Sequence, residues 1–369
     1  MMDNNNMAGI LYDFLMVKFY FCSNIGSPNM KKKPTYILGI ESSCDDTAAA
    51  VLKDNIVLSN CIANQEVHRA YGGVVPELAS RAHQANIVPV VQRALSIANI
   101  DKKELTAIAY TRGPGLLGSL LVGSAFAKSL ALSLDIPLIE VNHMQAHLLC
   151  HFIKNEEKQP PSFPFLGVTI SGGHTQLVLV EDFFKMTQIG TTLDDAIGEA
   201  FDKCGKTMGL RYPAGPEIDK LAKQGNSEAF EFPIPKVKNY DLSYSGVKTA
   251  FLNLINNNVA KNPNFVANNL NDLCASIQKT LVQIIIQKIT KAKEDFNLDQ
   301  VVIGGGVAAN SEIRRVLNEK AASAQWEVFL PPFQYTTDNA AMIGVVGYYK
   351  HMENQLGAMD QSVNARLTF

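Results

Sequence analysis

A two-lobed fold of mixed α/β class is predicted by three features of this 369-residue chain. The first is an internal repeat, because residues 38–47 (LGIESSCDDT) are echoed by residues 166–175 (LGVTISGGHT) with Leu, Gly, Ser and Thr in register. The second is that each copy has the pattern of an apolar strand, a turn of small polar residues and another strand. The third is the length, which suffices for two domains that each have a core.

The first lobe, residues 34–150, is expected to begin with three strands and to continue with alternating helices and strands. Its strands are expected at 36–41, 48–52, 56–63, 107–111 and 138–141, and its helices at 77–98 and 117–133. Three strands followed by alternating elements form a mixed α/β plan.

The second lobe, residues 151–369, repeats this plan. Its strands are expected at 165–170, 176–180, 186–191 and 300–303, and its helices at 195–208, 217–223, 270–293 and 311–322. Residues 226–245, rich in Pro, Asn and Tyr, are expected to form an inserted loop near a cleft between the lobes, toward which the last helix packs back. Turns of small residues from both lobes can hold a phosphate in such a cleft, so the duplication predicts nucleotide binding.

Composition narrows the class of protein. The formal net charge of −2 gives no global attraction to nucleic acid. The six cysteines lack CxxC spacing and the density of a secreted scaffold, which indicates reduced thiols of a cytosolic protein. The apolar part of residues 1–33 is too short and interrupted for a membrane span. These residues are expected to be a disordered or mis-assigned extension, with translation starting at Met30, because Met30 is followed by three lysines and then by the first strand.

Two histidines are the first candidates for metal binding. His143 and His147 follow a strand at i and i+4, which places both imidazoles on one face of a helix and suits a divalent metal. An amphipathic helix with two histidines is the alternative. Asp338 before the last helix can supply a third ligand or can be only a helix cap. No Glu follows His143, so the HExxH arrangement is absent and a zinc-peptidase mechanism is disfavoured.

Glycine-rich turns are the second kind of candidate. Residues 171–174 (SGGH) offer backbone donors with little steric bulk, although an ordinary hairpin turn has the same pattern. Residues 304–310 (GGGVAAN) follow a buried strand and precede a helix, where a nucleotide can lie against the chain. Asn310 can cap that helix, bind ligand or do both. The GxGxxG fingerprint is absent, which disfavours a nicotinamide cofactor.

Three acidic residues are candidates with open alternatives. Asp202 and Asp219 lie on expected helices, where they can accept hydrogen bonds from ribose or form a solvated face. Asp45 in the first turn can hold metal-bound water or orient phosphate. Cys44 beside it has no flanking base, which disfavours a thiol nucleophile.

Eight ordered motifs make the chain recognisable from about Tyr36 to the last helix. They are GIESSCDDT, HMQAH, ISGGHTQL, GEAFDK, YPAGPEID, DLSYSGVKT, GGGVAAN and TDNAAM. The chain closely resembles the universal tRNA N6-adenosine threonylcarbamoyltransferases of the bacterial and organellar type, once called glycoproteases. The resemblance implies an actin/Hsp70/sugar-kinase-like fold of two ribonuclease H-like lobes around a nucleotide cleft. It also implies transfer of a threonylcarbamoyl group from threonylcarbamoyl-adenylate to N6 of adenosine 37 in tRNAs reading ANN codons.

The resemblance also assigns roles to residues. It implies that His143, His147 and Asp338 bind one divalent metal ion, Fe²⁺ in first place with Zn²⁺ or Mg²⁺ as alternatives. Asp45 is carried over as a catalytic acid/base or metal-linked group. The positions implied to contact the adenylate are Ile170, Ser171, Gly172, Gly173, His174, Asp202, Gly215, Asp219 and Asn310.

The implied partners are the tRNA anticodon loop and either a catalytically silent paralogue with a small ATPase or a second copy of the chain. The expected location is the cytoplasm, with no membrane as partner. The silent paralogue itself would lack the histidine pair and Asp338, which this chain keeps. Two departures from the family pattern, Ala214 and Ala340, stand where glycine is common and require an ordinary backbone there. The competing interpretation is a small-molecule kinase or an ATP-dependent switch of the same fold class, which would not need the two histidines.

Overall fold

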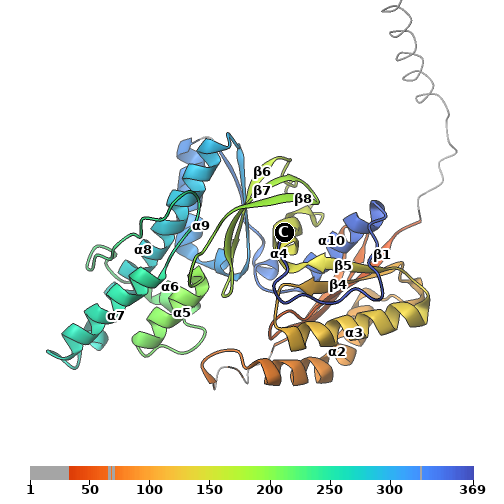
Figure 1. The fold of residues 1–369 in the computed structure, drawn as a ribbon, viewed down its shortest axis with the longest axis horizontal. Coiled ribbons are helices and arrows are strands. Elements are labelled where there is room, and N and C mark those ends of the chain that lie inside the picture. The colour runs from red at the N-terminus through yellow and green to blue at the C-terminus, as the bar shows by residue number, and fades with distance from the viewer. Residues whose placement is uncertain (1–32, 65–67, 69–70, 325) are drawn as a thin grey trace, which may run out of the picture. The chain divides into compact units, whose positions relative to one another are not determined.

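The computed structural model describes residues 33–64, 68, 71–324 and 326–369 of the chain. Residues 35–369 form one compact unit, drawn as a ribbon in Figure 1. The expected N-terminal extension and the start at Met30 concern residues that lie almost entirely outside the described part.

The first sheet has the strand order β3-β2-β1-β4-β5. Its strands are β1 (Tyr36–Glu41), β2 (Thr47–Lys53), β3 (Ile56–Ala63), β4 (Ala107–Gly113) and β5 (Leu138–Asn142). The central strand β1 pairs antiparallel with β2, with Tyr36 opposite Lys53, and parallel with β4, with Ile37 opposite Ala107. Five of the six residues of β1 are buried, as a strand covered on both faces requires.

The second sheet repeats this topology with the order β8-β7-β6-β9-β10. Its strands are β6 (Phe165–Ile170), β7 (Thr175–Asp182), β8 (Lys185–Thr191), β9 (Gln300–Gly304) and β10 (Glu327–Phe329). Here β6 pairs antiparallel with β7 and parallel with β9. The duplication predicted from the repeat is thereby confirmed as two sheets of identical strand order and direction.

Helices cover both faces of the first sheet. α2 (Pro76–Ala98) and α3 (Leu117–Leu134) pack on one face, and α10 (Ala340–Met352) packs on the other against β1, β2 and β4 (Figure 1). Alternation along the strands separates the faces, since Leu38 and Ile40 join the core under α2 while Ile37 joins the core under α10. α3 is apolar and long enough to cross a membrane by length and composition, but here it is one of the covering helices.

Five helices build the core beside the second sheet. They are α5 (Ile197–Thr207), α6 (Gly215–Ala222), α7 (Ser245–Val259), α8 (Phe265–Asp295) and α9 (Ser311–Ala324). The opposite face of this sheet contributes Phe165 and Val178 to a central core that also holds residues of α10 and of α4 (His143–Leu149). This central core joins the two sheets, so residues at the start of α4 and of α10 lie between them.

Most expected elements match the structure within two residues; the exceptions are α7, α8 and β10, and no strand was expected at β10. α5 begins at Ile197, two residues after the expected start, and the preceding Asp194 and Asp195 accept from Tyr244 N–H and Lys248 Nζ at the beginning of α7. α7 itself was not anticipated, and residues 226–244 before it are mostly irregular. α8 begins at Phe265, earlier than the expected 270.

Candidate metal centre and substrate site

The two histidines are positioned by the short helix α4. Asn142 at the end of β5 caps this helix, since its Oδ1 accepts from the backbone N–H of Met144 at 2.8 Å and of Gln145 at 3.2 Å. His143 and His147 therefore lie on successive turns, with ring centroids 4.7 Å apart. Both are buried, His147 completely.

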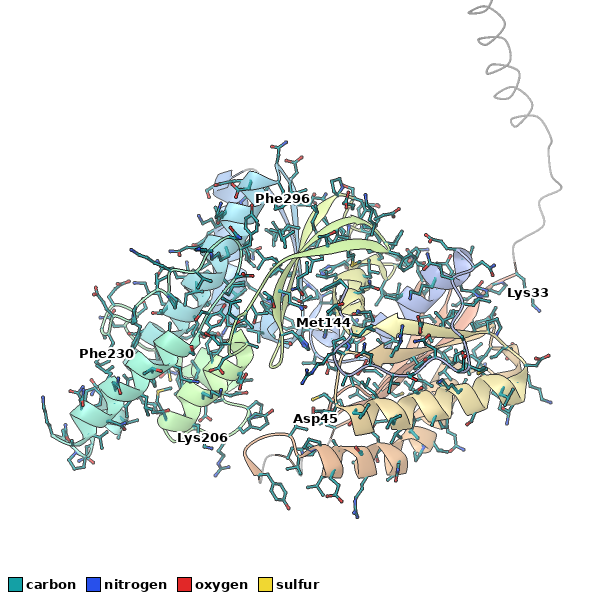
Figure 2. All side chains as sticks on the ribbon, viewed as in Figure 1. Lys33, Asp45, Met144, Lys206, Phe230 and Phe296 are labelled. Carbon is teal, nitrogen blue, oxygen red and sulfur yellow. The ribbon has the colours of Figure 1, made fainter. Side chains whose placement is uncertain are left out.

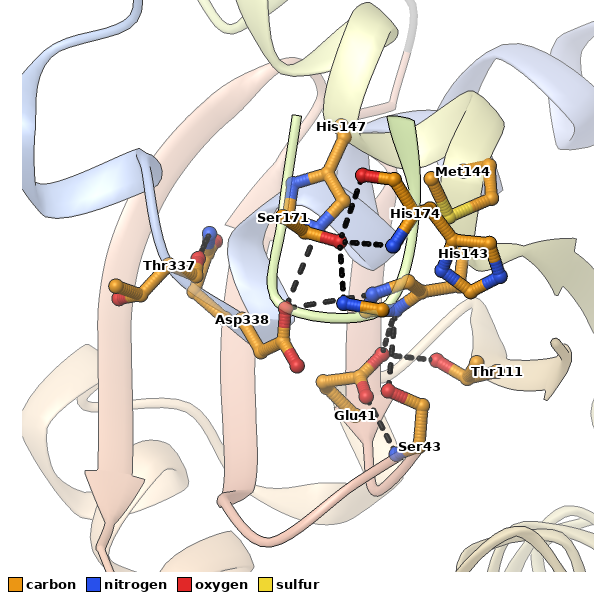
Figure 3. A network of polar contacts seen from close by, with 12 residues as sticks. Glu41, Ser43, Thr111, His143, Met144, His147, Ser171, His174, Thr337 and Asp338 are labelled. Atoms are coloured by element: carbon orange, nitrogen blue, oxygen red, sulfur yellow. Dashed lines mark hydrogen bonds and ion pairs between the residues drawn. The ribbon is translucent and has the colours of Figure 1, made fainter. Parts of the chain in front are cut away.

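Asp338 meets the histidines from the loop before α10. Its Oδ1 lies 3.3 Å from His143 Nε2 and 3.2 Å from His147 Nε2 (Figure 3). The helix cap is the next residue, Asn339, whose Oδ1 accepts from Met342 N–H at 3.0 Å. The alternative that Asp338 only caps the helix is therefore wrong, and its carboxylate faces the histidines.

These three side chains fit a divalent metal ion. Their donor atoms lie within 4.8 Å of one another. His147 Nδ1 is buried without a hydrogen-bond partner in the described part of the chain, and His147 Nε2 faces the Asp338 carboxylate at 3.2 Å, where a cation held between them would be bound by both groups. Two imidazoles and one carboxylate suit a first-row divalent ion and leave coordination positions for substrate.

Burial and neighbouring charges shift the pKa values of all three side chains. Burial alone would raise the pKa of Asp338, but the charge of His143 and hydrogen bonds from both histidines hold it well below its usual range. Burial alone would lower the pKa of His143, but the carboxylates of Glu41 and Asp338 raise it well above its usual range. The pKa of His147 is lowered, mainly by burial.

A second carboxylate stands behind His143. Glu41, the last residue of β1, is fully buried, and its Oε2 lies 3.1 Å from His143 Nδ1. Ser43 N–H and the Thr111 hydroxyl donate to the same carboxylate, each at 2.5 Å (Figure 3). The sequence analysis did not single out Glu41, although an acidic residue at the end of a buried apolar strand is an available signal.

The SGGH turn lies beside the metal-binding cluster. Ser171 Oγ accepts from the N–H of His174 at 3.0 Å and of Gly173 at 3.3 Å, so two of the turn's donors are used within it. A Cβ built on Gly172 or Gly173 would meet no atom within 4 Å, so the turn is open toward a ligand. Burial and the charge of His143 lower the pKa of His174 to about 4, which keeps its ring neutral.

The GGG loop packs closely against both sides of the site. Gly305 has a φ of +95°, and a Cβ there would lie 2.4 Å from the carbonyl of Ile170. A Cβ on Gly304 would lie 2.5 Å from the carbonyl of His147. Only glycine therefore allows β9 to approach α4 and the SGGH turn this closely.

Asp202 and Asp219, two further predicted contacts of the adenylate, form hydrogen bonds to the backbone at the starts of α6 and α9. Asp202 Oδ1 accepts from the N–H of Ala214 at 2.7 Å and of Gly215 at 3.3 Å. Asp219 Oδ1 accepts from the hydroxyl of Ser311 at 2.8 Å and from its N–H. The backbone at Ala214 is ordinary, with φ −86° and ψ −20°, which explains why alanine is tolerated there.

The side chain of Asn310 caps α9 and also forms a hydrogen bond to another side chain. Its Oδ1 accepts from the N–H of Glu312 and Ile313 at the start of α9, and its Nδ2 donates to Gln278 Oε1 at 2.8 Å. An amide has two N–H donors, so one remains for a ligand.

Comparison with known proteins decides the family. The family model for tRNA N6-adenosine threonylcarbamoyltransferase matches residues 56–345. A protein of that name from Christiangramia forsetii is 56% identical to this chain over 340 residues. The matched region covers 92% of this chain and 100% of the Christiangramia forsetii protein. The chain belongs to this family. Another member, from Porphyromonas gingivalis, is 54% identical over 91% of this chain and 99% of its own length.

Solved structures agree with the family in fold. HypF in a phosphate- and nucleotide-bound form matches 86% of this chain and 56% of its own, with 16% identity and a TM-score of 0.57. HypF from T. kodakarensis matches 87% of this chain and 48% of its own, with 14% identity and a TM-score of 0.55. The predicted two-lobed actin/Hsp70/sugar-kinase-like class is confirmed for this member of the threonylcarbamoyltransferase family.

Asp45 lies in the loop between β1 and β2 and is not one of the three donors of the metal-binding cluster. Figure 2 shows it at the edge of the first lobe that faces the second. Burial, with the charges of Asp202 and Asp45, raises the pKa of Tyr212 to about 12. The neighbouring Asp46, which the sequence analysis left aside, has its pKa raised to about 7 by burial and by the charge of Asp45.

Proposed function

We propose that this chain transfers the threonylcarbamoyl group of threonylcarbamoyl-adenylate to N6 of adenosine 37 in tRNAs that read ANN codons, forming t6A and releasing AMP. The observation that carries the proposal is the cluster of His143, His147 and Asp338 beside the SGGH and GGG turns, in a member of the threonylcarbamoyltransferase family. In the reaction, the N6 amine forms a bond to the carbamoyl carbon while the bond from that carbon to the phosphate oxygen breaks.

We infer that one divalent metal ion binds the cluster, with Fe²⁺ as the first choice and Zn²⁺ or Mg²⁺ as alternatives. Two nitrogen donors favour Fe²⁺ or Zn²⁺ over Mg²⁺, which prefers oxygen ligands. When bound, the ion supplies positive charge that polarises the carbamoyl oxygen and stabilises the departing phosphate.

The side chains of the cleft would hold the adenylate. Ser171, Gly172, Gly173 and His174, with Ile170 behind them, would bind the phosphate and carbamoyl end. Asp202 and Asp219 keep acceptor capacity for ribose hydroxyls, near Gly215 and Asn310. Asp45 would accept the proton that the N6 amine loses as the new bond forms.

The proposed partners are the tRNA anticodon loop and either a catalytically silent paralogue with a small ATPase or a second copy of this chain. Exposed leucines on α3 support a protein partner, since Leu117, Leu121 and Leu132 are 55%, 53% and 73% exposed. We place the protein in the cytoplasm, away from membranes. The five described cysteines are unpaired, as expected there.

For the domains we propose a first lobe of residues 34–150 and a second lobe of 151–369. The second would carry the 226–245 insertion, and its last helix would return toward the cleft. The packing of α10 on the first sheet supports that return. A kinase or ATP-dependent switch of the same fold is not favoured, because neither needs two histidines beside an aspartate.

A single-turnover assay tests the function. The purified chain would be mixed with threonylcarbamoyl-adenylate and unmodified tRNA, with and without chelator, and the modified nucleoside would be measured by mass spectrometry. We expect product that the chelator abolishes and that His143→Ala lowers by at least about a hundredfold. His351→Ala, a histidine at the end of α10, is the matched control and should keep the wild-type rate. No product even after addition of the paralogue and the ATPase would contradict the proposal.

A further inference from the structure

Glu41 has no role in the chemistry described so far, yet its side chain is fully buried. A buried carboxylate is stabilised only when hydrogen bonds or charges compensate the loss of water. Glu41 has three such partners, the N–H of Ser43, the hydroxyl of Thr111 and the ring of His143. The chain therefore builds a specific site for this carboxylate at the end of β1.

Glu41 is not placed to bind the metal itself. The cluster of donors in the described residues consists of His143, His147 and Asp338. Glu41 lies on the other side of the His143 ring, against Nδ1, whereas Nε2 faces Asp338 (Figure 3). Any effect of Glu41 on the metal must therefore pass through the imidazole.

An ionised carboxylate can only accept hydrogen bonds, so it selects the form of His143 that carries a proton on Nδ1. That leaves the lone pair on Nε2, the nitrogen that faces Asp338 and His147. Ser43 Oγ, 3.3 Å from Nδ1, can accept weakly from the same proton. His147 Nδ1 has no corresponding partner in the described part of the chain.

We propose that Glu41 is a positioning residue of the metal centre, which fixes the tautomer and the ring orientation of His143 so that Nε2 is free to bind the ion. This inference rests on the metal centre of the proposed function. Partners of this kind commonly change metal affinity by about 10- to 100-fold when removed.

Glu41→Gln is a sharp test because a backbone N–H group determines the orientation of the glutamine side-chain amide. Ser43 N–H can only donate, so the amide oxygen must take the place of Oε1, 2.5 Å from it. The amide NH₂ then faces His143 Nδ1 and requires that atom to accept. His143 is thereby forced to carry its proton on Nε2, where the metal should bind.

The experiment uses the full chain and Zn²⁺ as a diamagnetic probe. Zinc affinity is measured by competition with a chromophoric chelator, and the protonation of the histidine nitrogens by NMR of protein labelled with ¹⁵N-histidine. For Glu41→Gln we expect zinc binding to be about 10- to 100-fold weaker, and the Nδ1–H signal of His143 to be lost. Glu140→Gln, on β5, is the matched control and should bind zinc like the wild type, since Glu140 contacts Arg112 instead of a histidine.

Two results would overturn the proposal. One is a Glu41→Gln protein that binds zinc within about threefold of the wild type. The other result comes from the wild-type protein alone. When loaded with zinc, it must show a slowly exchanging proton on His143 Nδ1. Zinc bound through Nδ1 contradicts the proposal, even if Glu41→Gln fails to fold. Absence of zinc binding by the wild type would instead refute the metal centre, and this inference with it.

Discussion

At the scale of single residues, the ionisation of Asp46 should affect stability near neutral pH. Its pKa rises to about 7 in the folded protein, through burial and the charge of Asp45, against about 3.9 when unfolded. Below pH 4 both states hold the proton and there is no effect. As pH rises toward 7 only the unfolded state releases it, so folding is increasingly disfavoured.

Asp46→Asn should therefore stabilise the metal-free protein more at pH 8 than at pH 5. Three pKa units correspond to about 4 kcal/mol, and partial exposure of the side chain reduces this to about 2 kcal/mol. Urea denaturation at several pH values measures the difference. Asp360→Asn, at an exposed position, is the control substitution, and a stabilisation by Asp46→Asn that is equal at pH 5 and pH 8 would argue against the mechanism.

The residues of the candidate site differ in how far the sequence reveals them. The i, i+4 spacing of His143 and His147 is visible in the sequence, because a helix places both on one face. Asp338 comes from a distant loop, and only the family motif connected it to them. Glu41 was missed because its role depends on contacts to Thr111 and His143, which are 70 and 102 residues away along the chain.

At the scale of elements, the packing of α10 on β1 controls where Asp338 lies. Gly39 allows this contact, since a Cβ there would lie 2.4 Å from the carbonyl of Ala340 and 2.8 Å from the nitrogen of Gly344. Both are backbone atoms, so the helix itself would have to move. Because Asp338 precedes α10 by two residues, a shift of the helix should displace the carboxylate from the histidines.

Gly39→Ala should thus lower both the stability and the metal affinity. Overpacking of a well-packed core costs about 1–3 kcal/mol, and we expect zinc binding to weaken at least about tenfold. Chemical denaturation and chelator competition measure the two effects. Gly246→Ala, at the start of α7, is the control, because a Cβ there would meet only Pro235 at 3.9 Å. Loss of stability with unchanged zinc affinity would refute the link between α10 and the site.

Elements with a strong local pattern could be predicted, and those set by tertiary contacts could not. The hairpins repeat a sequence pattern, and both copies were found. α7 is rich in asparagine, which has low helix propensity, and it is held by the buried face of Val247, Phe251 and Ile255. The end of α8 nearest to it was missed for a similar reason, since Asn268 and Asn269 obscure its apolar period.

At the scale of the whole molecule, the C-terminal strap, residues 355–369, follows α10 along the first sheet. Backbone bonds join Gly357 to Leu138, Asn364 to Arg112, and Ala365 to Gly115. The strap ends beside α4 (Figure 1), where the Thr368 carbonyl accepts from Asn142 Nδ2 at 2.9 Å. The repeat in the sequence could not reveal this strap, because it has no counterpart in the other half of the chain.

Asn142 links the strap to the metal centre, since the same side chain caps α4 with its Oδ1 and binds the strap with its Nδ2. Deletion of residues 367–369 removes that acceptor and the packing of Phe369 on the central core. We expect faster hydrogen exchange in residues 143–149 and a loss of about 1–2 kcal/mol in stability. Thr368→Ala keeps the backbone carbonyl and should exchange like the wild type. If hydrogen exchange in α4 is unchanged in the truncated protein, Asn142 caps α4 without the help of the strap. The C-terminus then does not stabilise the position of the two histidines.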